Sequence, residues 1–205
     1  MTYDDIVNLA LAYADKKKDP EVTGNVDNFL RIVESRLNYK LKIQKMAARA
    51  TLHTTENQLY YGLPPDFAGM RDIELRESND SLAVTTLVYY NPEQMNSIIG
   101  KSSDIYYYTI IADQIQISQS PDNHVLEIVY YRKVPALDNV NRTNWVSEGY
   151  PDLYVFGLQV EINSFVKDAD AAALWDARFK DKLEEVTNDD QATRWSGTPL
   201  VIRNG

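Results

Sequence analysis

The sequence contains no cysteine, which excludes disulfide bonds and thiolate metal sites. Their absence suits a protein made in a reducing cytoplasm. It also lacks any run of the roughly 18 apolar residues that a membrane-spanning helix needs. The acidic residues 1–5 do not begin an apolar signal sequence. We therefore expect a soluble protein that is made in the cytoplasm, is not exported and has no membrane partner.

Positive charge is the second shortage, because 30 acidic side chains outnumber 21 basic ones and give a formal net charge of −9. Such a chain binds DNA poorly, since affinity for phosphate comes from clustered Lys and Arg. The sign suits a surface past which DNA slides without adhering. The lysine run at residues 16–18 is flanked by Asp15 and Asp19, which favours a solvated loop over a phosphate contact.

Residues with catalytic potential are few and badly placed. The only histidines, His53 and His124, fall on separate predicted elements, so they make a poor metal site. Ser118, Asp122 and His124 supply the residue types of a hydrolase triad. They lie on one predicted turn, however, and cannot easily converge as triad members must.

Other chemical motifs fail in the same way. Residues 100–102 match only the end of a P-loop and follow a predicted helix instead of opening one. Within each of the acidic pairs 184–185 and 189–190, the two side chains point in different directions on a helix, so neither pair suits acid–base catalysis. Glu74, Glu127 and Glu161 lie among apolar residues but form no recognisable pair. We predict no enzyme activity, no metal and no cofactor.

The composition supports a folded core, since 44% of the 205 residues are hydrophobic and 11% aromatic. Hydrophobic periodicity predicts helices at 3–14, 26–48, 151–166 and 168–194. Thr2, Asn91 and Asp168 are candidate N-caps. The helix at 151–166 is apolar on two faces, so it should be covered on both sides.

Between these helices the period changes to that of strands over residues 50–131. A hairpin is predicted at 106–117, and the strand at 125–131 should be central because only Glu127 interrupts its apolar faces. The fold class is therefore α+β: N-terminal helices, an antiparallel meander with hairpins, two C-terminal helices and an extended C-terminal tail. We expect residues 1–195 to form a single domain, followed by a tail at 196–205.

Opposite charges gather on different predicted helices. Residues 26–49 carry six basic and two acidic side chains, whereas residues 150–195 carry ten acidic and five basic ones. Pairing of these segments, within or between subunits, is favoured over a DNA-facing basic strip. The residues predicted to form a subunit interface are Arg36, Lys40, Trp145, Tyr154, Leu158, Ile162 and Phe165.

The tail contains three consecutive apolar residues at 200–202, which fits either docking on a partner or packing on its own domain. Trp195, at the start of the tail, is of a type that is common in binding hot spots. The tyrosines at 106–108 could stack on nucleic-acid bases, but strand alternation favours core positions.

Several segments, in their order along the chain, resemble phage head-to-tail adaptor (connector) proteins, particularly those of short-tailed phages. They are ESRLNYKLKIQKMAARATL, LPPDFAGMRDIEL, YNPEQM, YYTIIADQIQIS, LEIVYYRKVPAL, TNWVSEGYPDLY and SGTPLVIR. The resemblance covers most of the chain. One departure is Ala112, because relatives commonly have glycine at this hairpin position.

This resemblance implies a virion protein of the head–tail neck. It would form a ring, usually a dodecamer, beneath the portal protein, extend the DNA channel, seal the head and attach tail or nozzle proteins. Genomic DNA would pass through without specific binding. Apart from the resemblance, we predict that the isolated protein is monomeric and oligomerises on its portal. The residues implied in portal docking are Trp195, Pro199, Leu200, Val201, Ile202 and Arg203. Two alternatives remain: another neck or tail-completion ring protein, and a virion-associated wall-degrading enzyme.

Overall fold

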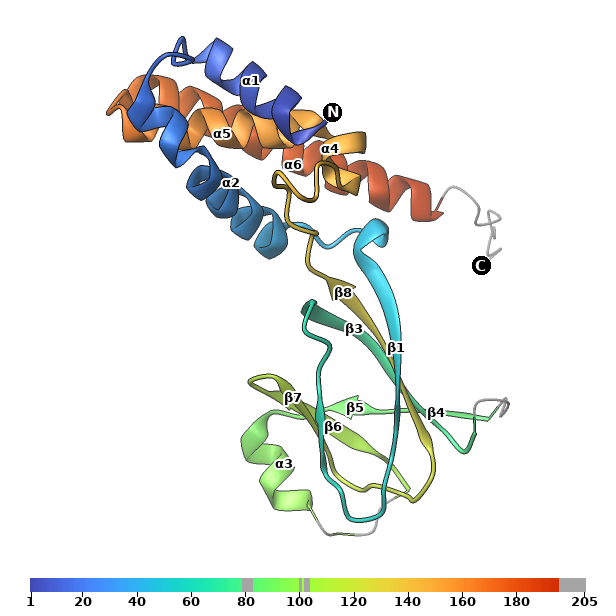
Figure 1. The fold of residues 1–205 in the computed structure, drawn as a ribbon. Coiled ribbons are helices and arrows are strands. Elements are labelled where there is room, and N and C mark those ends of the chain that lie inside the picture. The colour runs from blue at the N-terminus through green and yellow to red at the C-terminus, as the bar shows by residue number, and fades with distance from the viewer. Residues whose placement is uncertain (79–82, 100, 102–103, 196–205) are drawn as a thin grey trace, which may run out of the picture. The chain divides into compact units, whose positions relative to one another are not determined.

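The structure, a computed structural model, describes residues 1–78, 83–99, 101 and 104–195, except for the side chains of residues 194 and 195. The chain divides into two compact units. The helical unit comprises Met1–Lys45 and Val134–Gly205, and the β unit comprises Met46–Lys133. Helices form the first unit and strands dominate the second (Figure 1), so the α+β class predicted from the sequence is confirmed.

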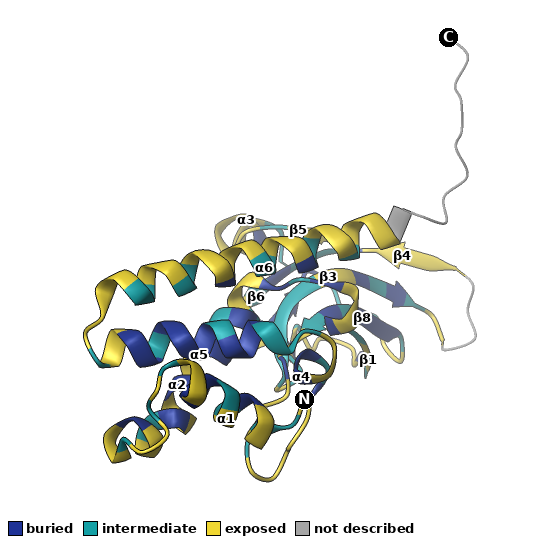
Figure 2. Cartoon of the chain, turned by 90° about the horizontal axis from the view of Figure 1, so that it is seen from above, coloured by how far each residue is buried: buried dark blue, intermediate teal, exposed yellow. Residues whose placement is uncertain are grey.

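Five helices build the helical unit, and α5 is the one that all the others contact. The helices are α1 (Tyr3–Tyr13), α2 (Pro20–Lys40), α4 (Trp145–Gly149), α5 (Pro151–Phe165) and α6 (Ala169–Trp195). Figure 2 shows the contrast in burial: α5 is dark blue along most of its length, whereas α6 is largely exposed. The expected covering of α5 on both sides is confirmed, since Leu153, Tyr154, Leu158 and Ile162 are fully buried.

Gly157 allows the helices around α5 to approach closely. A Cβ atom at this position would lie 2.6 Å from Val33 Cγ1 on α2 and 3.3 Å from Phe179 Cε2 on α6. Real Cβ atoms do not pack at the first of these distances, so any larger residue would force α2 away. The packing of α2 and α6 on α5 therefore depends on this glycine.

Helix α2 differs from the prediction at both ends. It starts at Pro20 because the Asp19 carboxylate accepts hydrogen bonds from the backbone N–H groups of Glu21 and Val22. It ends at Lys40, so the expected helix at 26–48 is wrong over its last eight residues. The chain leaves the helix in an extended conformation at Leu41, forms a short 3-10 helix at Gln44–Met46, and buries Leu41 and Ile43. Tertiary burial has overridden the helical period.

Capping residues predicted where helices begin more reliably than the hydrophobic period predicted where α2 ends. Thr2 forms a capping box with Asp5 at the start of α1. Asn91 does the same with Gln94 at the start of α3 (Pro92–Ile98), and Asp168 accepts a hydrogen bond from Ala171 N at the start of α6. These helix starts are confirmed because capping depends on residues three apart.

The β unit contains two four-stranded sheets. The first has the order β1 (Ala47–His53), β8 (Val125–Arg132), β3 (Phe67–Arg76) and β4 (Val84–Thr86), and is antiparallel throughout. The second has the order β2 (Tyr60–Gly62), β7 (Gln114–Ile117), β6 (Tyr107–Ile111) and β5 (Val88–Tyr89). The predicted central position of β8 is confirmed, because it lies between β1 and β3.

The strand order departs from the expected meander. β8 inserts between β1 and β3, and β5 pairs with β6 in parallel. A shared core between the sheets explains this order, because it joins Leu126 and Ile128 of β8 to Ile115 and Ile117 of β7. Burying these residues together requires pairings between strands that are distant in sequence.

The predicted hairpin is present as β6 and β7, in which Ile111 is paired with Gln114. Its two-residue turn places Ala112 at a φ of 52°, a left-handed conformation that disfavours any side chain with a Cβ. The turn is therefore built with alanine at a steric cost that glycine would not have.

Substitution of Gly157 by alanine should lower the free energy of unfolding by about 1–3 kcal/mol, because overpacking against Val33 exceeds the gain in helix propensity. Gly24→Ala is the matched control: this position is also helical, and no atom lies within 4 Å of its added Cβ. It should stabilise the protein by about 0.5–1 kcal/mol. Chemical denaturation measures both, and equal effects would contradict the close approach.

Ala112→Gly should raise the free energy of unfolding of the β unit by about 0.5–1 kcal/mol, because it removes the left-handed strain of the hairpin turn. Ala50→Gly in β1 is the control, and it should lower the stability by a similar amount because a strand interior gains nothing from glycine. Thermal unfolding monitored by circular dichroism compares the two variants. A loss of stability in Ala112→Gly would refute the argument.

Candidate assembly surfaces of the helical unit

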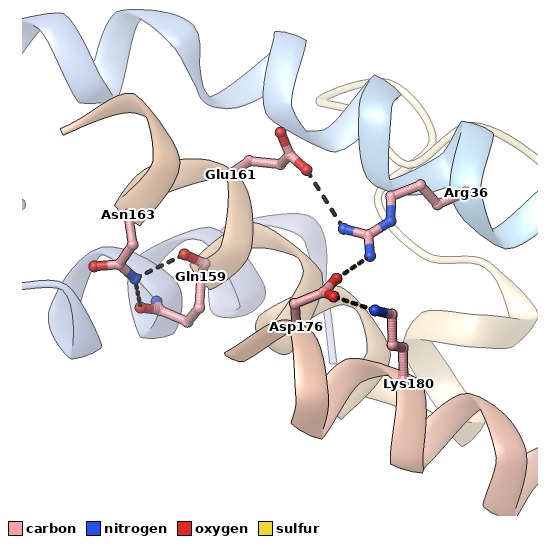
Figure 3. A network of polar contacts seen from close by, with 6 residues as sticks. All are labelled: Arg36, Gln159, Glu161, Asn163, Asp176 and Lys180. Atoms are coloured by element: carbon pink, nitrogen blue, oxygen red, sulfur yellow. Dashed lines mark hydrogen bonds and ion pairs between the residues drawn. The ribbon is translucent and has the colours of Figure 1, made fainter. Parts of the chain in front are cut away.

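Arg36 on α2 joins three helices through its guanidinium group (Figure 3). Nη1 lies 3.5 Å from Glu161 Oε1 on α5, and Nη2 donates to Asp176 Oδ1 on α6. The guanidinium carbon also lies 4.5 Å from the centre of the Phe179 ring. Basic α2 and acidic α6 are thus paired within one subunit at this point.

The two carboxylates that share Arg36 respond differently to their surroundings. Burial raises the pKa of Glu161, and attraction to Arg36 opposes this only in part. Hydrogen bonds from Lys180 and Arg36 lower the pKa of Asp176, whose second oxygen lies 2.6 Å from Lys180 Nζ. The network is a structural clamp, because each carboxylate is held by a cation.

A second polar network was not foreseen from the sequence. The buried Glu34 carboxylate accepts hydrogen bonds from Leu137 N at 2.6 Å and from the Tyr154 hydroxyl at 3.1 Å. Asn144 donates to the same hydroxyl at 2.7 Å. Burial raises the pKa of Glu34 and that of Tyr154. The signal in the sequence was a carboxylate inside an apolar stripe, between Leu30 and Leu37.

These bonds attach the long connection at 133–149 to the helices. Asn38 accepts from Val134 N at 2.7 Å, and Leu137 and Val146 are buried. Val140, in contrast, is 82% exposed at the tip of the connection. The exposed tip of the connection is the part that can reach a partner.

Three residues predicted for the subunit interface are core residues instead. Tyr154, Leu158 and Ile162 have no exposed surface, since α1, α2, α4 and α6 cover α5. A partner subunit cannot contact them in the folded protein. The apolar pattern of α5 was read correctly as two-sided, but the cover comes from the same chain.

The other four predicted interface residues lie nearer the surface. Lys40 is exposed at the end of α2, and Phe165 is 42% exposed beside Phe29, with a ring separation of 5.4 Å. Arg36 is partly exposed but engaged in its ion pairs. Trp145 packs edge-on against Tyr150, and its buried indole N–H has no hydrogen-bond partner.

Exposed aromatic side chains add candidates that sequence reasoning missed. Tyr13 is 58% exposed and stacks on Trp175, whose ring also contacts Phe156. Arg178 lies over the Trp175 ring at 4.7 Å. Trp175 fits a core stripe by its spacing, so nothing in the spacing indicated that its ring is only half-buried. Of the predicted portal-docking residues, Pro199 to Arg203 lie outside the described residues, as does the side chain of Trp195.

In the β unit, the residues that resemble a catalytic group hold turns together. Ser118 Oγ accepts from Tyr107 N at 3.0 Å, and Ser120 Oγ donates to Thr55 O at 2.8 Å. The His124 ring lies 2.8 Å from the Asp122 carbonyl oxygen. The arrangement positions backbone atoms and contains no nucleophile beside a base.

Two buried or half-buried glutamates of the β unit, Glu127 and Glu74, are likewise held in structural contacts, in their case ion pairs with arginines. Glu127 lies 3.2 Å from Arg49 and 3.6 Å from Arg76, which also contacts Glu74 at 3.0 Å. Within the described residues, no group of three or more histidines and carboxylates could hold a metal ion. Every helix in the described part of the chain is too short or too polar to cross a bilayer.

The fold is α+β, and the surface of the helical unit presents aromatic and charged side chains. Comparison with protein families gives a match to the SU10 adaptor protein over residues 1–203. The chain therefore belongs to the SU10 adaptor protein family. A comparison with curated proteins gave no match.

Family membership confirms the resemblance to phage head-to-tail adaptors. The chain is a structural adaptor of a bacteriophage virion and acts at the neck, where portal and tail components are its partners. The family is not a class of enzymes.

Glu34 makes the stability of the helical unit depend on pH. Burial raises the pKa of Glu34 in the folded chain above the ordinary value of 4.5, which it keeps in the unfolded chain. At a pH between the unfolded and the folded pKa, the folded chain therefore keeps a proton that the unfolded chain has lost. The wild type should therefore lose stability relative to Glu34→Gln as the pH rises above 4.5 and through the raised pKa. Denaturant titrations across this range measure the difference, and parallel stability curves would contradict it.

Glu34→Ala is the companion variant. It leaves Leu137 N and the Tyr154 hydroxyl without their acceptor, which should cost about 1–3 kcal/mol at neutral pH. A neutral effect would show that the network is not stabilising.

Proposed function

We propose that the chain forms a closed ring beneath the portal, where it extends the DNA channel, seals the filled head and supplies the attachment site for tail or nozzle proteins. The family match over residues 1–203 carries this proposal. A dodecamer is the expected ring, as the resemblance to adaptors of short-tailed phages implies. The ring assembles on the portal from monomers.

Charge supports the passage of DNA through such a ring. The net charge of −9 leaves few cations to retain phosphate groups. Lys40 on α2 lies over the exposed ring of Tyr39, and aromatic side chains are enriched in protein interfaces. Genomic DNA is therefore a transient occupant of the channel and is not specifically bound.

In this proposal the C-terminal tail binds the portal, and residues of the helical unit form the contact between neighbouring subunits. Residues Trp195 and Pro199 to Arg203 dock on the portal, since an apolar terminal segment can add to a partner's surface. Arg36, Lys40, Trp145 and Phe165 lie at or near the contact between subunits. Tyr154, Leu158 and Ile162 support that surface from the core and do not touch the neighbour.

Mixing the protein with portal rings of the same phage and imaging by electron microscopy tests the proposal. The expected result is one added ring for each portal, aligned with its channel. Portals that stay bare would overturn the proposal. Binding to isolated tail tubes instead would assign the protein to another neck or tail-completion ring.

Removal of residues 196–205 should abolish portal decoration and leave the circular dichroism spectrum unchanged. Leu200→Asp combined with Ile202→Asp should have the same effect, because a charged tail cannot enter an apolar site. Removal of residues 204–205 alone is the matched control and should preserve decoration. Portal binding by the fully truncated chain would refute the role of the tail.

A further inference from the structure

The C-terminal half of α2 exposes one face that is both apolar and basic. Asn28, Ile32, Ser35 and Tyr39 are spaced as one helical stripe and are all exposed. Ile32 is 46% exposed and Tyr39 78% exposed, which is high for large apolar side chains. We call Arg31, Ile32, Tyr39 and Lys40 the α2 face. No exposed acid lies on this half of the helix, since Glu34 is buried.

Helix α6 exposes a face of complementary character. Asp170, Leu174, Asp181 and Glu184 follow one helical stripe, are all exposed, and are called the α6 face. Leu174 is 54% exposed. Within the described part of the chain, the three acids of this face make no ion pair. The acids beside the stripe differ, because Asp176 and Glu185 are bound by Lys180 and Lys182.

The apolar and charged side chains of the two faces have similar spacing. On α2, Lys40 follows the apolar Ile32 by eight residues, or about 12 Å along the axis. On α6, Asp181 follows the apolar Leu174 by seven residues, or about 10.5 Å. When the helices are aligned in parallel with Ile32 against Leu174, Lys40 comes to lie beside Asp181 and Glu184. Arg31 then comes within reach of Asp170.

We propose that the α2 face of one subunit binds the α6 face of a second copy of this chain, an assignment that rests on the proposed ring. The occupant is another copy because the charges of the two faces complement each other. They cannot pair within one subunit, since α2 and α6 both pack on α5 through their buried sides. A contact between two different patches is head-to-tail and can close into a ring.

Disulfide trapping tests the contact directly, because the chain has no other cysteine. Tyr39→Cys in one preparation and Glu184→Cys in a second, distinguished by an affinity tag, are mixed with portal rings of the same phage under mild oxidation. We expect the mixed disulfide to form at least tenfold faster than with Asp170→Cys, which lies on the same face at the other end. Equal rates overturn the contact, and faster trapping with Asp170→Cys overturns its parallel alignment.

Charge reversal separates the contact from simple collision. Arg31→Glu with Lys40→Glu, placed in the Tyr39→Cys chain, should slow trapping at least tenfold. Asp170→Lys with Asp181→Lys in the Glu184→Cys chain should restore it, because the charges again complement each other. These residues are exposed, so folding should be unaffected. The proposal is overturned if the charge reversal leaves the trapping rate unchanged, or if the reversed charges on the second chain do not restore it.

The same variants distinguish this contact from the proposed function as a whole. If trapping fails while wild-type rings still decorate portals, the ring forms through other surfaces and only the present inference falls. If portals also stay bare, the proposed function falls with it.

Discussion

The close approach at Gly157 is the constraint on which the helical unit depends. Because α5 is apolar around most of its circumference, it must be covered on every side, and α2 and α6 both have to come within contact of the same residue. The polar interactions follow from this packing. Arg36 can reach Glu161 and Asp176 only because α2, α5 and α6 converge there. Glu34 is buried on the same helix, and its carboxylate is tolerated because it accepts hydrogen bonds from Leu137 N and from the Tyr154 hydroxyl.

Burial inside the subunit also decides which surfaces remain for assembly. An apolar residue on a helix can be covered by its own chain or by another, and the spacing of residues is the same in either case. Tyr154 and Leu158 were assigned to a subunit contact for this reason, and they are core residues. Ile32 and Tyr39 have the same helical period but face outward. Only the three-dimensional packing distinguishes the two groups, because it depends on residues more than a hundred positions away.

The elements that were predicted correctly are those set by neighbouring residues. The caps at Thr2, Asn91 and Asp168, the hairpin around Ala112 and the two-sided pattern of α5 all follow from residues within one turn or one strand. The end of α2 and the strand order did not follow from local pattern. Leu41 leaves the helix to be buried elsewhere, and the residues of β8 pair with residues at least 49 positions before them. Of the candidate sites, the opposite charge of α2 and the C-terminal helices was visible in the sequence, whereas the aromatic group around Trp175 was not.

The β unit interrupts the helical unit in sequence, since residues 46–133 separate α2 from α4. During synthesis α1 and α2 therefore emerge before the helix that covers them exists. At about 5–20 residues per second, the intervening segment delays α5 by roughly 5–20 s. The strands that close the β unit, from β1 to β8, are all complete within that interval. The β unit can thus fold on the ribosome first. The apolar sides of α1 and α2 remain uncovered until the last third of the chain has been synthesised.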